Sequence, residues 1–371
     1  MRTEVFAVED TAVQVVWEDG PRGPVEVRAA WNGGSAAQTV LGDGGPGAVV
    51  LEGLPPATTV RVTLGDQTVE TVTTLAPPPG RILSRFATIN DMHIGAVEFG
   101  TLRRIWDDDH ADPHPERCMR AAIDEAVAWG AEALIVKGDL TKHGRLREWE
   151  VVATILGSVG LPMLVIEGNH ETKQGAIDGS DFLARHGIDL TVGRAAYLDL
   201  PGVRIVAVPT AKLHKGSGEI VDRVSTEAVA LVASAPAGAV AVLHHYPQRF
   251  RHQTLYPSGI PGPGASRFLD AVASANPATL VLAGHSHRHR RHAHGPVAVA
   301  EVGSTKDYPG SWAGYTVHAG GIMQTTRRVM EPSAIRWTTR GRRVLGGVWG
   351  VWAPGLRSHR CFSYVWPGRP S

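Results

Sequence analysis

Five short apolar segments after residue 80 alternate with stretches of helical periodicity, and each apolar segment ends in Asp, Asn or His. The apolar segments are RFATIND, AEALIVKGD, LPMLVIEGNH, GAVAVLHHYP and ATLVLAGHSH, and the stretches between them include PERCMRAAIDEAVAWG and SRFLDAVASAN. Strands that alternate with helices predict an α/β layered fold in which helices cover the sheet faces. Ligands of open α/β sheets bind beyond the carboxyl ends of the strands, so these polar ends predict one shared site.

The first 75 residues show a different pattern, in which apolar and polar residues alternate over short runs. The runs AVQVVW, VEVRAAW and TTVRVTL are separated by clusters of Gly, Pro, Asp and Asn, which is typical of a small antiparallel β-sandwich. The segment VVLEGLPPATTVRVTL resembles the fibronectin type III pattern, and the stiff proline linker LAPPPG follows it. We therefore predict three units: an all-β, fibronectin type III-like sandwich domain over residues 1–75, an α/β domain over residues 81–328, and a basic, Trp-containing extension over residues 329–371.

Composition limits the location and the partners of the chain. Its 371 residues include 37 basic and 36 acidic ones, for a formal net charge of +1. The net charge therefore gives no electrostatic reason to expect nucleic acid or an anionic membrane as a binding partner. Only two cysteines occur, which in a chain of this length indicates reduced thiols rather than a disulfide framework. The N-terminal MRTEVFAVEDTAVQVVW carries acidic residues where a signal peptide needs an unbroken apolar run. We predict a cytoplasmic protein without a membrane span, and leave the oligomeric state open.

The five polar strand ends contain the residue types that bind divalent metal ions. They are Asp91 and His93 in DMH, Asp139 in KGDLTKHG, Asn169 and His170 in EGNHE, His244 and His245 in LHHYP, and His285 and His287 in GHSH. Each cluster alone has a structural explanation, such as a helix cap, a turn or a hydrogen-bonded core histidine. Five such clusters in one domain instead predict a composite metal site with carboxylate, amide and imidazole ligands.

In chain order the motifs read D-x-H, G-D-x(4)-G, G-N-H-E, H-H-x-P and G-H-x-H. This ordered set resembles the calcineurin-like metallophosphoesterase family over residues 81–328, and most closely its cyclic nucleotide phosphodiesterase and glycerophosphodiesterase branch. The resemblance implies a four-layer α/β sandwich, with two mixed β-sheets flanked by helices and a centre of two divalent metal ions such as Mn, Fe, Zn or Mg. It also implies a phosphodiesterase or phosphomonoesterase that cleaves phosphoester bonds by attack of a metal-bridged hydroxide.

The resemblance further implies a role for each motif residue. The first ion would be held by Asp91, His93 and His287, the second by Asn169, His285 and one of the paired histidines, and Asp139 would bridge the two. Within the G-D-x(4)-G loop, Lys142 and His143 stand where the family often has an acidic residue. This departure leaves the number of implied ligands unchanged.

The paired histidines leave one assignment open. His244 stands where the family's ligand usually lies, and His245 would then bind substrate; because the motif reads HHYP rather than HHPP, His245 remains an alternative ligand. His170 matches the family's non-ligand histidine and would stabilise and protonate the leaving oxygen.

Three functions follow from this site. We expect a small-molecule phosphoester as substrate. A nuclease of the DNA-repair type shares the motifs, but the near-zero net charge does not favour nucleic acid. A non-catalytic protein-interaction scaffold of the same fold would not need the complete ligand set together with His170.

Two further stretches carry metal-binding residue types without matching a motif. His289, His292 and His294 are flanked by Arg288, Arg290 and Arg291, which favours a solvated connection over a role in holding substrate phosphate. The acidic stretch IWDDDHADPHP predicts a loop at the rim of the pocket rather than a third metal site.

Overall fold

The computed structural model of the chain describes residues 2–100, 104–250 and 256–368. Residue 1 and residues 369–371, at the outer ends of the predicted 1–75 and 329–371 units, lie outside the described residues, as do 101–103 and 251–255 within the predicted 81–328 unit. Within the described ranges, no helix has both the length and the apolar character needed to cross a membrane.

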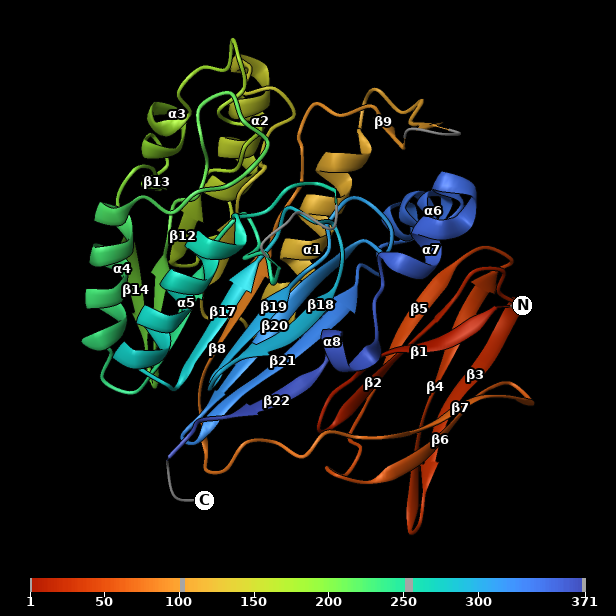
Figure 1. The fold of residues 1–371 in the computed structure, drawn as a ribbon. Helices are drawn as coiled ribbons and strands as arrows, with labels where there is room; N and C mark the ends of the chain where they lie inside the picture. The colour runs from red at the N-terminus through yellow and green to blue at the C-terminus, as the bar shows by residue number, and fades with distance from the viewer. Residues whose placement is uncertain (1, 101–103, 251–255, 369–371) are drawn as a thin grey trace.

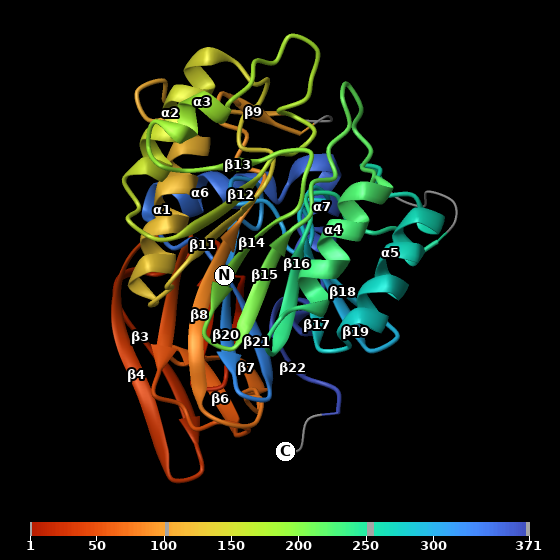
Figure 2. The same cartoon turned by 90° about the vertical axis from the view of Figure 1, so that its left-hand side faces the viewer.

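Two mixed β-sheets lie face to face at the centre of the larger part of the molecule (Figures 1 and 2). In sheet order, the seven-stranded sheet consists of β13 (Leu190–Thr191), β12 (Met163–Ile166), β11 (Leu134–Lys137), β8 (Ile82–Ile89), β20 (Ser311–His318), β21 (Gly321–Arg328) and β22 (Phe362–Val365). The six-stranded sheet consists of β14 (Ala196–Leu200), β15 (Val203–Ala207), β16 (Gly238–Val242), β17 (Thr279–Ala283), β19 (Val297–Glu301) and β18 (Arg290–His294). The strands β8, β11 and β12 are parallel in the first sheet, and β15, β16 and β17 are parallel in the second.

Helices cover the outer face of each sheet. Beside the seven-stranded sheet lie α1 (His114–Ala128), α2 (Leu146–Gly157), α3 (Ser180–Ala184) and α6 (Pro332–Gly341); beside the six-stranded sheet lie α4 (Asp222–Ala233) and α5 (Gly262–Ala275). Three apolar clusters fill the two helix–sheet interfaces and the space between the sheets. In the middle cluster, Phe86 of β8 stacks on Tyr315 of β20 with ring centroids 4.6 Å apart. The predicted four-layer α/β fold is therefore confirmed.

The central strands are apolar on both faces because both faces are covered. All five residues of β16, GAVAV, are buried, and so are all five of β17, TLVLA. Such continuous apolar runs are expected of parallel strands between two layers. Polar residues can therefore enter these segments only where the strands end, and this restriction places them at the edge where the strand ends meet.

The N-terminal region forms a separate all-β sandwich. One sheet consists of β1 (Thr3–Val8), β2 (Ala12–Trp17) and β5 (Gly47–Glu52), and the other of β4 (Gly34–Asp43), β3 (Arg22–Trp31), β6 (Thr59–Leu64) and β7 (Gln67–Thr73). Alternate residues of these strands point inward and form one apolar cluster, which includes the fully buried Val60 and Val62. The predicted small β-sandwich is present, and its fibronectin type III character stays a prediction.

The sandwich is docked on the larger part by buried polar contacts. Glu9 accepts a hydrogen bond from Nε of Arg327 at 2.7 Å, and both side chains are at most 8% exposed. Gln14 exchanges two hydrogen bonds with the main chain of Arg328, at 2.8 and 2.9 Å. Both arginines belong to β21, and β1 packs against this strand.

The C-terminal segment connects the two parts. After α6 it forms the short helices η1 (Val344–Gly347), α7 (Val348–Trp352) and α8 (Arg357–Arg360). It then returns as β22, which pairs antiparallel with β21 and completes the seven-stranded sheet. The end of the predicted 329–371 extension is thus part of the central sheet, while the division into three units stays a prediction.

The histidine-rich stretch after the last motif differs from the expectation. The ring of His289 is fully buried: the amide of Gly303 donates to its Nδ1 at 3.1 Å, and Oγ of Ser311 lies 3.2 Å from its Nε2. The prediction of a solvated connection is therefore wrong for His289, because the chain turns inward before it forms the edge strand β18. His292 and His294, on β18, are partly buried.

Candidate metal centre

The ends of five parallel strands bring the predicted ligands together. Asp91 follows β8, Asp139 follows β11, Asn169 follows β12, His244 follows β16 and His285 follows β17. Four overlapping groups of side chains, each with ligand atoms within 4.8 Å of one another, are formed by Asp91–His93–His287, His93–Asp139–His170, Asp91–Asp139–His244 and His244–His245–His285. The structure therefore gathers at one edge of the sheets all of the residues that the sequence assigns to metal, acid and substrate.

The first ligand group contains Asp91, His93 and His287. Nε2 of His93 lies 3.1 Å from Nε2 of His287, and the latter atom lies 3.5 Å from Oδ1 of Asp91. The three donor atoms come from two different sheets, because β8 belongs to the seven-stranded sheet and His287 follows β17 of the six-stranded one. A cation between these atoms would have one carboxylate and two imidazole ligands.

The second ligand group contains Asn169 and His244, which lie near Oδ1 of Asp139. Nε2 of His244 lies 3.3 Å from Oδ1 of Asp139 and 3.3 Å from Oδ1 of Asn169. Oδ2 of the same aspartate lies 3.7 Å from Nε2 of His93. The two oxygens of Asp139 thus face different ligand groups, which is the geometry that a bridging carboxylate requires.

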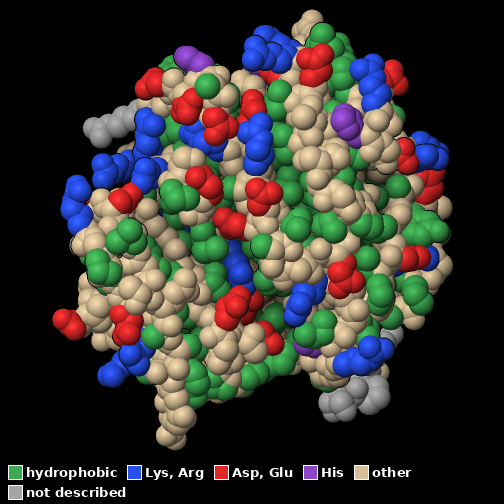
Figure 3. All heavy atoms as spheres, turned by 180° about the vertical axis from the view of Figure 1, so that it is seen from behind, with side chains coloured by type: hydrophobic (Ala, Val, Ile, Leu, Met, Phe, Trp, Pro, Cys, Tyr) green, Lys and Arg blue, Asp and Glu red, His purple; other side chains and the backbone are tan. Residues whose placement is uncertain are grey.

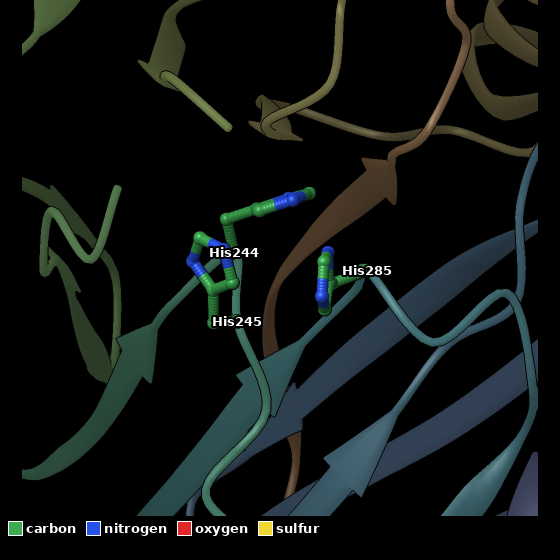
Figure 4. A group of neighbouring side chains, drawn as sticks. All are labelled: His244, His245 and His285. Atoms are coloured by element: carbon green, nitrogen blue, oxygen red, sulfur yellow. The ribbon is translucent and has the colours of Figure 1, made fainter. Parts of the chain in front are cut away.

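The paired histidines occupy different surroundings (Figure 4). Nδ1 of His244 lies 2.8 Å from the carbonyl oxygen of Lys137, so its Nε2 is directed at Asp139. Nδ1 of His245 instead lies 2.9 Å from Oγ1 of Thr210. These contacts support His244 as the ligand. His245 is fully buried and is absent from the described lining of the cavity at this site, so its predicted contact with substrate stays a prediction.

The backbone around the site is strained. Five of the predicted ligands have φ values between 48° and 65°, a left-handed conformation that is uncommon for residues other than glycine: Asp91, His93, Asp139, His285 and His287. Residues held in such conformations persist only where the surrounding structure enforces them, and they gather at functional sites. Each ligand leaves its strand through a sharp turn that aims the side chain at the shared centre.

Glycines next to the ligands permit the close approach of neighbouring segments. Gly138 has φ of 82°, and a Cβ atom there would stand 2.6 Å from Nδ1 of His244. A Cβ atom on Gly168 would collide with the carboxylate and the amide nitrogen of Asp139. Any larger residue at these two positions would therefore displace a predicted ligand.

The donor set fits divalent cations. Asp91 and Asp139 are 0% and 2% exposed, and two buried carboxylates this close need positive charge to balance them. Oδ1 of Asp91 and Nδ1 of His285 are buried without a hydrogen-bond partner among the described residues. Burial alone would raise the pKa of Asp139, but the charges of His244 and His170 hold this pKa well below its usual value. Carboxylate, amide and imidazole donors together suit Mn, Fe or Zn, whereas an all-oxygen site would favour Mg or Ca.

His170 lies beside the ligands and lines the same cavity as five of them: His93, Asp139, Asn169, His285 and His287. Its amide donates to Oδ1 of Asp139 at 3.0 Å, and its Nδ1 lies 2.9 Å from the carbonyl oxygen of Lys142 and 2.8 Å from Nζ of Lys173. Burial lowers the pKa of His170 to about 4, although the charge of Asp139 acts in the opposite direction. The contacts hold the ring beside Asp139 and His93, with which it forms one of the four groups of close ligand atoms.

The sequence pattern did not identify Asp307, which orients a predicted ligand. Oδ2 of Asp307 lies 2.8 Å from Nδ1 of His287, and Nζ of Lys306 donates to the other carboxylate oxygen at 2.6 Å. Burial alone would lower the pKa of His287, but the charges of Asp91 and Asp307 outweigh burial and raise it to about 9. Asp307 lies in a loop outside all five motifs, so only the fold reveals its contact with His287.

The acidic stretch before α1 makes structural contacts. Asp107 accepts hydrogen bonds from the amide of His114 and from Nη2 of Arg117, and Oδ1 of Asp109 accepts from the amides of Ala111 and Asp112. None of these side chains belongs to a candidate metal group within the described part of the chain. These contacts fix the loop that precedes α1 and the start of the helix.

Known proteins are similar to this chain in sequence. A family model for calcineurin-like phosphoesterases matches residues 84–289. A probable cyclic nucleotide phosphodiesterase of Ruthia magnifica is 29% identical over 86 residues, which are 23% of this chain and 32% of that protein. The match therefore spans about a third of the relative's length.

Solved structures extend the comparison to the fold. A dimetal phosphatase from Danio rerio is 12% identical, with 68% of this chain and 98% of that chain covered at a TM-score of 0.51. A purple acid phosphatase from yellow lupin, Lupinus luteus, is also 12% identical, with 88% and 71% covered at a TM-score of 0.48. At this level of identity, the likeness to the first structure concerns the fold alone.

Proposed function

The chain belongs to the calcineurin-like phosphoesterase family, and from this premise we propose that it is a two-metal hydrolase of small-molecule phosphoesters. Family membership makes it a metal-dependent phosphoester hydrolase. The observation that carries the finer proposal is the position of Asp139, whose two oxygens face separate groups of metal-binding side chains.

We assign the predicted ligands to two ions. Asp91, His93 and His287 would hold one ion, Asn169, His244 and His285 would hold the other, and Asp139 would bridge them. When bound, two divalent ions supply positive charge to the phosphate oxygens and lower the pKa of an attacking water. Asp307 would keep the ring of His287 in place through its hydrogen bond to Nδ1.

The cavity supplies further groups for the phosphoester. Lys142 and Lys306 line it together with His170, so two lysines stand in the wall of the cavity that would hold an anionic phosphate. His170 would stabilise the leaving oxygen and give it a proton. Its predicted role is supported by its place beside Asp139 and in the lining of the cavity.

A small substrate is favoured over nucleic acid. The cavity at the site has a volume of about 580 Å³, which is within the range of pockets that enclose small ligands. On the face shown in Figure 3, Lys and Arg side chains alternate with Asp and Glu, whereas a nucleic-acid track needs a basic stripe. The relative described as a probable cyclic nucleotide phosphodiesterase supports a phosphodiester as the first substrate to test. A cytoplasmic location is supported by the two cysteines, which are both buried and free.

Activity on simple esters tests the proposal. The purified chain, loaded in turn with Mn, Fe, Zn or Mg, is assayed on a panel of phosphodiesters and phosphomonoesters that includes bis(p-nitrophenyl) phosphate. We expect hydrolysis with at least one metal and about two bound ions per chain. Hydrolysis of no ester with any metal would contradict the enzyme proposal and favour a protein-interaction scaffold, whereas strong preference for DNA would favour the nuclease.

Asp139→Ala should abolish turnover, because the loss of a carboxylate between both groups disturbs both ions at once. Asp108→Ala, which removes an exposed aspartate of the loop before α1, is the matched control and should retain wild-type turnover. If Asp139→Ala hydrolysed bis(p-nitrophenyl) phosphate at the wild-type rate, the two-metal proposal would be wrong.

A further inference from the structure

The cavity at the metal centre is larger than a phosphate group needs, and part of its lining is apolar. Beside the predicted metal ligands, its lining includes Phe99, Val344, Leu345 and Trp349. Phosphoester chemistry occupies only the polar end of such a cavity. The remaining volume is therefore available to the organic group of the ester, and its apolar lining indicates which kind of group fits.

Two aromatic side chains of this lining are fixed by contacts with each other and with their neighbours. The rings of Phe99, on β9 (Glu98–Phe99), and Trp349, on α7, meet edge to face with centroids 5.6 Å apart and an interplanar angle of 61°. Nε1 of Trp349 donates to the carbonyl oxygen of Tyr308 at 3.1 Å. Nζ of Lys306 lies 5.4 Å from the centroid of Phe99, a cation–π distance. The two rings are therefore held in place before any ligand binds.

The backbone that carries Trp349 to the cavity is strained. Leu345, Gly346 and Gly347 have φ values of 55°, 67° and 92°, so three consecutive residues adopt left-handed conformations. For Leu345, which has a side chain, this conformation is uncommon and energetically unfavourable. Strain of this kind gathers at ligand-binding positions, and here it places Leu345 and Trp349 in the cavity lining.

This C-terminal part of the lining lies outside the residues that the family match covers. The match spans residues 84–289, whereas η1 and α7 begin at Val344 and Val348. The apolar lining from the C-terminal segment thus lies outside the matched part of the chain, where a preference among substrates can arise.

We propose that Phe99, Leu345 and Trp349 form a binding wall for a flat apolar group of the substrate, so that the site prefers phosphoesters that carry an aromatic ring. This inference rests on the proposed function, because the metal site must hold the phosphate end. The phosphate would bind at the metal ligands and the cationic side chains, while the ring would stack against the wall.

Binding of unreactive phosphonates tests the wall separately from hydrolysis. Titration calorimetry on the metal-loaded full chain compares phenylphosphonate, methylphosphonate and inorganic phosphate. Stacking on one aromatic side chain contributes about 1–3 kcal/mol, so Trp349→Ala should reduce the preference for phenylphosphonate over methylphosphonate by about 5- to 150-fold. Trp349→Phe should keep most of that preference. The affinity for inorganic phosphate should be unchanged in both variants, which shows that the metal end is intact.

Val351→Ala is the matched control, since Val351 lies on the same helix and is 75% exposed; it should behave as wild type. The wall proposal is overturned if Trp349→Ala keeps the wild-type preference, or if wild-type protein binds inorganic phosphate but shows no preference for the ring. A chain that binds phenylphosphonate through Trp349 and yet hydrolyses no ester would keep the wall and contradict the proposed function instead.

Discussion

Asp307 shows how one residue outside the motifs can set the geometry of a predicted ligand. It accepts from Nδ1 of His287 at 2.8 Å, across 20 positions of sequence, and it is itself paired with Lys306. An imidazole that donates through one nitrogen presents the other to a metal, and the carboxylate increases its basicity. Asp307 is therefore a positioning residue, whose loss should weaken metal binding before it affects folding.

We predict that Asp307→Asn lowers metal affinity by about 10- to 100-fold, measured by competition with a chelator of known affinity. Asp270→Asn is the matched control, because Asp270 forms a similar pair with His294 at 2.7 Å but is 70% exposed. Equal metal affinity in the two variants would show that Asp307 does not orient His287.

A second prediction separates chemistry from metal binding at neighbouring residues. His170→Ala should retain two bound ions and lose about 100- to 10,000-fold in rate on esters with poor leaving groups. The loss should shrink as the leaving group becomes more acidic, because such groups depart without a proton. Asn169→Ala should instead weaken the second ion.

The measurement is a series of aryl esters with graded leaving groups under saturating metal. His143→Ala removes an exposed histidine of the neighbouring loop and should follow the wild-type series. If the loss of hydrolysis rate in His170→Ala were the same for all leaving groups, His170 would not act as an acid. It would then be an electrostatic or structural group.

The entry to α1 illustrates how an element can depend on a neutral buried histidine. His114, the first residue of the helix, stacks on Trp337 of α6 with ring centroids 3.8 Å apart and lies 3.2 Å from Oδ2 of Asp107. Burial lowers its pKa to about 2, and the charge of Lys306 acts in the same direction. The surrounding charges are mixed: Arg117 and Arg340 also lower this pKa, and Asp307 raises it.

This buried ring predicts a pH dependence of stability. Because the pKa in the folded chain lies below the usual 6.5, the unfolded chain takes up the proton more readily. The stability that the neutral ring contributes is fully present above about pH 6.5 and decreases toward pH 2, by about 1.4 kcal/mol per pH unit. Between pH 7.5 and 5.5, the wild type should therefore lose about 1.4 kcal/mol more than His114→Gln.

Denaturant unfolding of both proteins at the two pH values gives this difference, in which the contributions of other groups cancel. His110→Gln, which changes an exposed histidine of the preceding loop, should keep the wild-type dependence. If the free energy of unfolding changed equally with pH in the wild type and in His114→Gln, His114 would not cause this pH dependence.

For the whole molecule, the N-terminal sandwich is joined to the catalytic layers through β21 rather than only through the proline linker. Glu9 and Arg327 are buried at this interface, so each charge depends on the other for compensation. β21 is also the strand that pairs with β22. The interface thus connects the sandwich, the central sheet and the C-terminal segment that lines the cavity.

Glu9→Ala should lower the free energy of unfolding by about 3–5 kcal/mol, because it leaves Arg327 buried and unpaired. Glu70→Ala is the matched control: it breaks the pair of Glu70 with Arg357, whose side chains are 36% and 32% exposed, and should cost at most about 1 kcal/mol. Denaturant unfolding measures both. Equal losses would show that the Glu9–Arg327 pair does not stabilise the docked sandwich.

The sequence by itself determined the α/β class, the N-terminal β-sandwich and the position of each polar strand end. It could do so because strands such as β16 and β17 are apolar along their whole length, so that His244 and His285 stand out directly after them. The ordered motifs then identified the family. These signals lie within short stretches of the chain, so they can be recognised in the sequence without the structure.

Only the tertiary structure decided which atoms face one another. The direction of Nε2 of His244 toward Asp139 depends on a carbonyl group of β11, and the support of His287 by Asp307 depends on a loop between sheets. The burial of His289 and the arrival of Trp349 at the cavity depend on how the C-terminal segment folds back. Such contacts join residues that are distant in sequence and carry no periodic signal, so packing alone determines them.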